Sequence, residues 1–163
     1  AEAMGLTKEQ IQAVHVAGQL HDVGKITLPT EILTKPGRLN EIEFAMIRTH
    51  PKAGFDILES IDFPWPIAKM VLQHHERQNG SGYPGGLKGD DILTEAKIIA
   101  VADVVEAMSS HRPYRPALGL DKALNEIEQN RETLYDPEVT DACMSVFREG
   151  KFTFKDEPAA PQH

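Results

Sequence analysis

The sequence has one cysteine, few aromatic residues and no excess of basic charge. Its single cysteine, Cys143, excludes an internal disulfide and is typical of a protein from a reducing compartment. Aromatic residues make up 6% of the 163 residues, and 17 Lys and Arg stand against 25 Asp and Glu, a net charge of −8. Surfaces that bind nucleic-acid polymers are normally basic, so we expect no such partner.

Long apolar runs are also absent. No stretch approaches the roughly 20 apolar residues that a membrane-spanning helix needs, and no signal peptide is recognisable. We therefore expect a cytoplasmic protein with no membrane segment in this chain. The acidic excess is uneven, because residues 116–163 hold five basic and ten acidic side chains. The total charge is thus a poor guide to what the remaining residues bind.

Helical signals recur along the chain. Thr7 with Gln10, and Asn40 with Glu43, have the spacing of a capping box, and Asp136 before a proline is a good helix start. Residues 95–109 are strongly apolar, residues 78–90 are a glycine-rich loop, and no strand-like alternation occurs. The sequence therefore predicts one all-α domain.

One predicted helix follows Asn40 and carries Ile42, Met46 and His50 on a single face. That spacing places His50 toward the interior and Met46 in the core. Pro51 is expected to kink the same helix just beyond His50.

Histidines and aspartates gather at helix ends and on apolar helix faces. Asp103 lies within the apolar stretch 98–105, where a carboxylate is costly unless it is paired or bound to a cation. Imidazole and carboxylate together, with no thiolate nearby, suit Fe, Mn, Ni or Zn. One inward histidine is more often a hydrogen-bonded core residue than a ligand. Six such groups from four predicted helices favour a metal site: His21, Asp22, His50, His74, His75 and Asp103.

The adjacent pair His74-His75 bears on the number of ions. Neighbouring residues on a helix point about 100° apart, so these two cannot easily chelate one ion together. Each could serve one of two neighbouring ions, with Asp22 as the natural bridge. Two metals roughly 3.5–4 Å apart can clamp both the attacking and the leaving oxygen of a phosphoryl group.

These residues also carry a resemblance to a known family. The ordered motifs resemble those of the HD-GYP proteins, a bacterial branch of the HD metal-dependent phosphohydrolases. The matching blocks are His21-Asp22-Val23-Gly24-Lys25, Leu33-Thr34-Lys35-Pro36-Gly37, His50, His74-His75-Glu76, Gly82-Tyr83-Pro84, Val101-Ala102-Asp103 and Arg112-Pro113-Tyr114-Arg115. They span roughly residues 3 to 150, nearly the whole chain.

The resemblance implies an HD-domain helical bundle of about six to seven helices over residues 1–155, with 156–163 as a flexible tail. Its first helix is expected to be truncated, because Ala1 to Met4 followed by Gly5 is typical of a last helical turn.

The resemblance also assigns roles to individual residues. The six histidines and aspartates match the metal ligands for two or three divalent ions, with Fe or Mn favoured over Ni or Zn. Asp22 and Lys25 are the expected catalytic residues. Gly82, Tyr83 and Pro84 form the signature loop, and Lys25, Tyr83, Arg112 and Arg115 are expected to contact substrate. Tyr83 could stack on a guanine base or serve simply as a loop anchor.

The implied function is hydrolysis of the bacterial second messenger cyclic di-GMP to pGpG, to GMP, or to both. Diguanylate-cyclase (GGDEF) domains and an upstream regulatory domain are the expected partners. Members usually have Asp-Gly before the signature loop where this chain has Asn79-Gly80, which could alter turnover. Two alternatives remain open: a non-catalytic module that binds a nucleotide or a partner, and a phosphohydrolase of another cyclic dinucleotide.

Three further residues receive structural interpretations. His15 lies off the face that carries His21 and is expected to be structural. Glu76 is expected to form a salt bridge or hydrogen bond with an imidazole. Cys143 sits in an apolar run far from the motifs and is expected to be an inert buried thiol.

Overall fold

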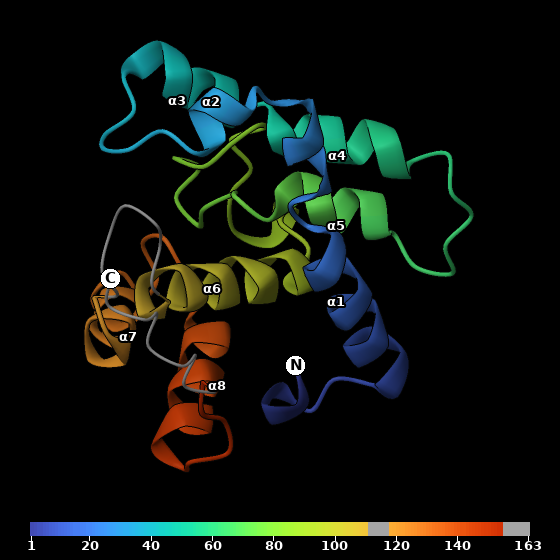
Figure 1. The fold of residues 1–163 in the computed structure, drawn as a ribbon. Coiled ribbons are helices and arrows are strands. Elements are labelled where there is room, and N and C mark those ends of the chain that lie inside the picture. Colours follow the sequence, from blue (N-terminus) through green and yellow to red (C-terminus); the bar gives the residue numbers. More distant parts are fainter. Residues whose placement is uncertain (111–117, 155–163) are drawn as a thin grey trace.

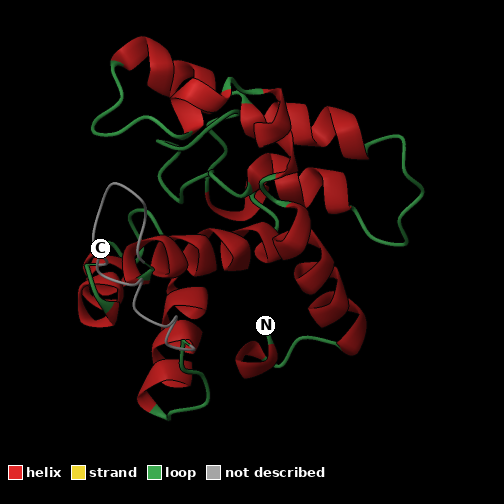
Figure 2. Cartoon of the chain, in the orientation of Figure 1, coloured by secondary structure: helices red, strands yellow, loops and turns green. Residues whose placement is uncertain are grey.

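The computed structural model of the chain describes residues 1–110 and 118–154. Within these ranges it consists of α-helices, three short 3₁₀ turns and loops, with no β-strand (Figures 1 and 2). The helices are α1 (Lys8–Leu20), α2 (Thr30–Leu33), α3 (Glu41–Ile47), α4 (His50–Leu58), α5 (Ile67–Gln73), α6 (Thr94–Ser109), α7 (Leu120–Gln129) and α8 (Pro137–Arg148). The turns are η1 (Glu2–Met4), η2 (Val23–Thr27) and η3 (Gly89–Asp91). Because α2 is a single turn, seven longer helices remain in the described residues. The predicted all-α bundle of about six to seven helices is therefore confirmed.

Local hydrogen bonds set the beginnings of three helices. Thr7 with Gln10 and Asn40 with Glu43 form complete capping boxes at α1 and α3. The Asp136 carboxylate accepts hydrogen bonds from two backbone N–H groups in the first turn of α8. All three starts agree with the sequence prediction, because each depends on residues within one helical turn.

Helix α6 lies between two groups of helices (Figure 1). On one side it packs against α1 and α5, around a cluster that includes Ala17, Ile67 and Ile99. On the other side it packs against α7 and α8, around Val105 and Ile127. Contact on both sides explains why residues 95–109 are so apolar, and it holds Asp103 near the middle of the molecule.

The region around His50 differs from the prediction. Instead of one kinked helix there are two, with α3 ending at Ile47 and α4 beginning at His50. Pro51 lies in the first turn of α4, where its missing N–H has no helical partner to lose. His50 is fully buried, but Ile42 is 75% exposed and Met46 is 38% exposed. The expectation that Met46 belongs to the core is therefore wrong, because α3 does not continue the face that α4 buries.

The ends of the chain follow the predicted pattern in part. Turn η1 ends at Gly5, whose φ of 69° is left-handed, as expected for a closing glycine. The predicted tail 156–163 lies outside the described residues, as do Arg112 and Arg115. None of the described helices is long and apolar enough to cross a lipid bilayer.

Candidate metal centre

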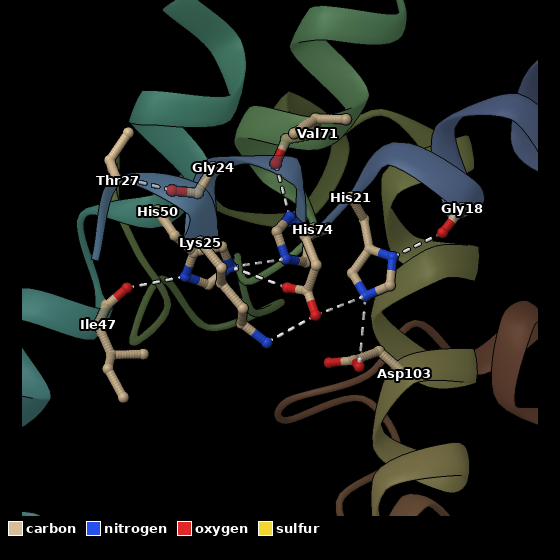
Figure 3. A network of polar contacts seen from close by, with 11 residues as sticks. Gly18, His21, Gly24, Lys25, Thr27, Ile47, His50, Val71, His74 and Asp103 are labelled. Carbon is tan, nitrogen blue, oxygen red and sulfur yellow. Dashed lines mark hydrogen bonds and ion pairs between the residues drawn. The ribbon is translucent and has the colours of Figure 1, made fainter. Parts of the chain in front are cut away.

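The six candidate ligands come together from separate parts of the chain. Figure 3 shows four of them, His21, His50, His74 and Asp103, facing one another. His21 and Asp22 lie where α1 leads into η2, and His50 begins α4. His74 and His75 follow the end of α5, and Asp103 comes from α6. Histidine clusters of this kind need each ring to be held in a fixed orientation.

Backbone carbonyls fix three of the rings. In each case the ring Nδ1 lies within hydrogen-bond distance of the carbonyl oxygen three residues earlier. The pairs are His21 with Gly18 (2.6 Å), His50 with Ile47 (2.8 Å) and His74 with Val71 (2.6 Å). Since a carbonyl oxygen only accepts, Nδ1 carries the hydrogen in each ring, and wherever the ring is neutral its Nε2 keeps a lone pair.

His50, His74 and His75 form one compact group. Their candidate ligand atoms all lie within 4.8 Å of one another. The Nε2 atoms of His50 and His74 are 3.3 Å apart. With both Nδ1 atoms protonated, two lone pairs face each other in a fully buried site, which leaves a polar atom without a partner. A divalent cation between the rings would satisfy both nitrogens.

The ionisation of these rings suits the same role. Burial lowers the pKa of His50, and lowers that of His74 to about 4. Burial, with the neighbouring His74, lowers the pKa of His75 to about 2. All three rings are therefore neutral near pH 7, which is the form that binds metal.

Both adjacent histidines belong to this group, closer together than the helical spacing alone led us to expect. Helix α5 ends at Gln73, so His75 lies beyond the regular helix. Their ring centroids are 4.1 Å apart. The 100° rule applies only within a continuous helix.

A second part of the centre contains His21 and Asp103. The Nε2 atom of His21 lies 3.6 Å from Oδ1 of Asp103, and this contact raises the pKa of His21. Burial acts to raise the pKa of Asp103, but the hydrogen-bonding contact with His21 and the nearby histidines lower it to about 2. The carboxylate in the apolar helix is thus paired, as the sequence required.

Asp22 lies between the two parts. Its Oδ1 atom is 3.4 Å from Nε2 of His50, and its Oδ2 atom is 3.5 Å from Nε2 of His21. Lys25 Nζ donates a hydrogen bond of 2.6 Å to the same Oδ2. A carboxylate whose two oxygens face two candidate ligand groups could contact a cation in each of them.

Glu76 holds residues 85–87, which directly follow the signature loop, close to the candidate metal ligands. This residue is 3% exposed, and its carboxylate accepts hydrogen bonds from the N–H groups of Gly85 (2.6 Å) and Leu87 (2.9 Å). The prediction that Glu76 pairs with an imidazole is therefore wrong. The carboxylate belongs to the loop, which residue spacing alone did not reveal.

Two further contacts bring the loop onto the His75 segment. A Cβ atom on Gly82 would lie 2.5 Å from backbone atoms of residues 75–77, so only glycine allows this approach. The N–H of Tyr83 donates to the His75 carbonyl at 3.2 Å, and the two rings stack with centroids 4.8 Å apart. The loop therefore covers one ligand directly.

Replacing Glu76 by alanine is expected to release this loop. The N–H groups of Gly85 and Leu87 would lose their charged acceptor, and a hydrogen bond to a charged group contributes about 1.5–3 kcal/mol. We expect faster amide hydrogen exchange at these two residues and a lower melting temperature. Glu59→Ala, at an exposed glutamate after α4, is the matched control. Unchanged exchange at both amides would contradict the role of Glu76.

Two cavities border the centre. One, of about 510 Å³, is lined by His21, Asp22 and Asp103 and by residues of α1 and α6. The exposed His15 also lines this cavity. The other, of about 410 Å³, is lined by His75, Asp103, Tyr83 and residues of α3 and α6. The ligand group is therefore open to small molecules from two sides.

The remaining predicted features are simple to place. Asn79 Oδ1 accepts a hydrogen bond from the N–H of Ser81 at 3.0 Å, so it keeps the turn that was expected of it. Cys143 packs beside the α7–α8 core, away from the centre, and burial raises the pKa of its thiol.

Sequence reasoning missed Phe44, Arg48 and Arg77 in the second cavity. The sequence offered one indication that Arg48 lies near the centre, because it stands two residues before the candidate ligand His50.

Comparisons with known proteins show what this chain is similar to. The family profile described as "HD domain" matches residues 1–139. The cyclic di-GMP phosphodiesterase response regulator RpfG of Xanthomonas campestris is 43% identical over 146 residues, which cover 88% of this chain and 39% of that protein. The 3'3'-cGAMP-specific phosphodiesterase 3 of Vibrio cholerae is 38% identical over 141 residues, or 86% of this chain and 30% of that protein.

A solved structure shows the same fold. Bd1817 of Bdellovibrio bacteriovorus, described as an HDG"Y"P protein, superposes with a TM-score of 0.72 at 18% sequence identity. The superposition covers 91% of this chain and 47% of that one. The chain therefore spans less than half the length of each of these proteins.

Proposed function

Because the chain belongs to the HD domain family, in its HD-GYP branch, we propose that it is a metal-dependent phosphodiesterase that hydrolyses cyclic di-GMP. The observation that carries this proposal is the pair of neutral, buried histidine nitrogens that face each other at 3.3 Å beside Asp22. A cation is the simplest partner for both. Relatives that are named as cyclic dinucleotide phosphodiesterases support the substrate class.

The chain's residues have separate roles in this proposal. His50, His74 and His75 would hold one ion, His21 and Asp103 a second, and Asp22 would contact both. Two or three divalent ions, with Fe or Mn preferred over Ni or Zn, would supply Lewis-acid stabilisation of the phosphoryl charge and activate water.

Lys25 is the expected partner of a phosphate oxygen. Its ammonium group already lies at the edge of the centre, 2.6 Å from Asp22, and its side chain is 36% exposed. It can therefore turn from Asp22 to an incoming anion with little rearrangement. Arg112 and Arg115 remain predicted substrate contacts, since guanidinium groups match phosphate oxygens.

The test is turnover by metal-loaded protein. We expect protein reconstituted anaerobically with Fe or Mn to convert cyclic di-GMP to pGpG, to GMP, or to both, and chromatography would identify the products. Chelation of the metal should stop the reaction and re-addition should restore it. Binding of the nucleotide without hydrolysis, with Fe, Mn and Ni each tried, would favour the non-catalytic signalling module instead.

A second substrate is favoured by one specific observation. A relative at 38% identity is named for 3'3'-cGAMP, which carries one guanine and one adenine. The same assay with that nucleotide would show whether it is also hydrolysed. We further propose a cytoplasmic location, an upstream regulatory domain, and contact between the signature loop and diguanylate-cyclase domains, which co-purification with such a domain would test.

A further inference from the structure

The cavity beside His75 has a composition that the phosphoryl chemistry does not explain. Its volume of about 410 Å³ lies within the range of small-molecule sites, roughly 300–1,000 Å³. The candidate ligands His75 and Asp103 form one side, and Phe44, Arg48, Arg77 and Tyr83 contribute to the rest. A group attached to a phosphate at the centre would therefore extend into this space.

Arg48 is held in place by two aromatic rings. Its guanidinium carbon lies 4.6 Å from the centroid of the Phe44 ring and 5.3 Å from that of Tyr83. Such contacts orient the guanidinium plane and leave its edge open. Within residues 1–110 and 118–154, no group accepts a hydrogen bond from this guanidinium. Its planar set of N–H donors is thus oriented but unused.

Arg77, on the same cavity, is already engaged. Its Nη1 atom donates to the carbonyl of Glu76 at 3.2 Å, and its guanidinium carbon lies 5.3 Å from the ring of Tyr135. Arg77 therefore spends one donor on the backbone of its own segment, whereas within residues 1–110 and 118–154 Arg48 spends none.

The remaining wall suits a flat ring. Val104, Met108 and Leu134 provide apolar side chains, and Tyr83 is fixed by the loop that Glu76 holds. Guanine presents two acceptors, O6 and N7, on one edge, and the arginine fork matches them with two parallel hydrogen bonds. Adenine presents a donor and an acceptor on that edge, so the same fork cannot pair with both.

We propose that this cavity is a guanine subsite in which Arg48 reads the O6/N7 edge of one base of the cyclic dinucleotide. The inference rests on the proposed function, whose substrate it specifies further. Cyclic di-GMP and 3'3'-cGAMP, which both contain guanine, would be accepted, and cyclic di-AMP would be rejected.

The first experiment compares base selectivity in the metal-loaded protein. For Arg48→Gln, we expect the ratio of kcat/KM for cyclic di-GMP to that for cyclic di-AMP to fall on the order of 10- to 100-fold, the usual value of a bidentate arginine–guanine pair. Arg148→Gln is the matched control, since Arg148 is exposed on α8 and pairs with Glu128 at 3.1 Å. An unchanged ratio in Arg48→Gln would overturn the proposal.

Arg48→Lys separates base reading from simple charge attraction. Lysine keeps the positive charge but lacks the planar fork. We expect it to lose selectivity nearly as fully as glutamine does. Full selectivity in Arg48→Lys would mean that a charge is sufficient, and the subsite as proposed would be wrong.

Two further measurements keep this proposal distinct from the proposed function. Equilibrium dialysis of the metal-loaded protein with GMP and with AMP needs no turnover, and we expect a preference for GMP that Arg48→Gln abolishes. Bis(p-nitrophenyl) phosphate, a diester without a base, reports on the metal centre without a base contact, and wild type and the control Arg148→Gln should hydrolyse it equally. Hydrolysis of that diester alone would refute the proposed substrate, and dialysis would still decide the guanine subsite. Equal binding of GMP and AMP by the wild type would refute the subsite.

Discussion

Replacing Asp22 by alanine is expected to abolish hydrolysis of cyclic di-GMP and to release bound metal. Both oxygens of this carboxylate face candidate ligands, His50 at 3.4 Å and His21 at 3.5 Å, so its loss removes a contact from each part of the centre. Removing a mere hydrogen-bonding partner of a metal ligand costs about 10–100-fold in affinity or activity. If Asp22 contacts both ions, as we propose, its loss should therefore reduce turnover by more than about 100-fold.

Metal content and turnover should be measured on the same preparations. Asp22→Asn keeps the size of the side chain but loses its charge, so we expect it to retain less metal than the wild type. Asp141→Ala, at an exposed aspartate of α8 that pairs with Arg131, is the control and should leave both quantities unchanged. Full metal content and turnover in Asp22→Ala would exclude the bridging role.

Replacing Gly24 by alanine is expected to be the most destabilising small substitution near the centre. A Cβ atom at this position would clash with the carbonyl oxygen of His50 and lie 2.5 Å from the backbone nitrogen of Gly54. Both contacts are with backbone, so η2 and α4 must separate. Overpacking of this kind costs about 3 kcal/mol or more, which corresponds to a fall of roughly 6–12 °C in melting temperature for a chain of this size.

The same substitution should weaken metal binding, because His50 begins the helix that would be displaced. Gly18→Ala is the matched control, since a Cβ atom there meets no heavy atom within 4 Å. Alanine in a helix is favoured over glycine, so we expect a gain of about 0.4–1 kcal/mol. Thermal denaturation of both variants tests the pair, and a wild-type melting temperature for Gly24→Ala would contradict the close packing of η2 on α4.

Much of the candidate site is predictable from the residues alone. A carboxylate at Asp103 in an apolar helix required a partner, and the structure supplies His21 at 3.6 Å. The grouping of histidines at helix ends, without thiolates, predicted the cluster of His50, His74 and His75. These predictions hold because a buried ionisable group is costly wherever the fold places it.

Other features could not be predicted, because they depend on segments far apart in the sequence. Glu76 holds residues 85–87, and Arg48 lies between Phe44 and the distant Tyr83. Exposure of Met46 follows from the packing of α4, which begins a new face at His50. In each case the helical pattern of the sequence allowed the side chain more than one packing or hydrogen-bonding partner.

The sequence by itself determined the helical class, the helix starts at Thr7, Asn40 and Asp136, and the residue types of the metal centre. These follow from hydrogen bonds within one turn and from the cost of burying charge. Only the tertiary structure decided that Asp22 lies between two ligand groups and that Arg48 has donors open to a cavity. The physical reason is that orientation across the centre depends on how η2, α3 and the signature loop pack together.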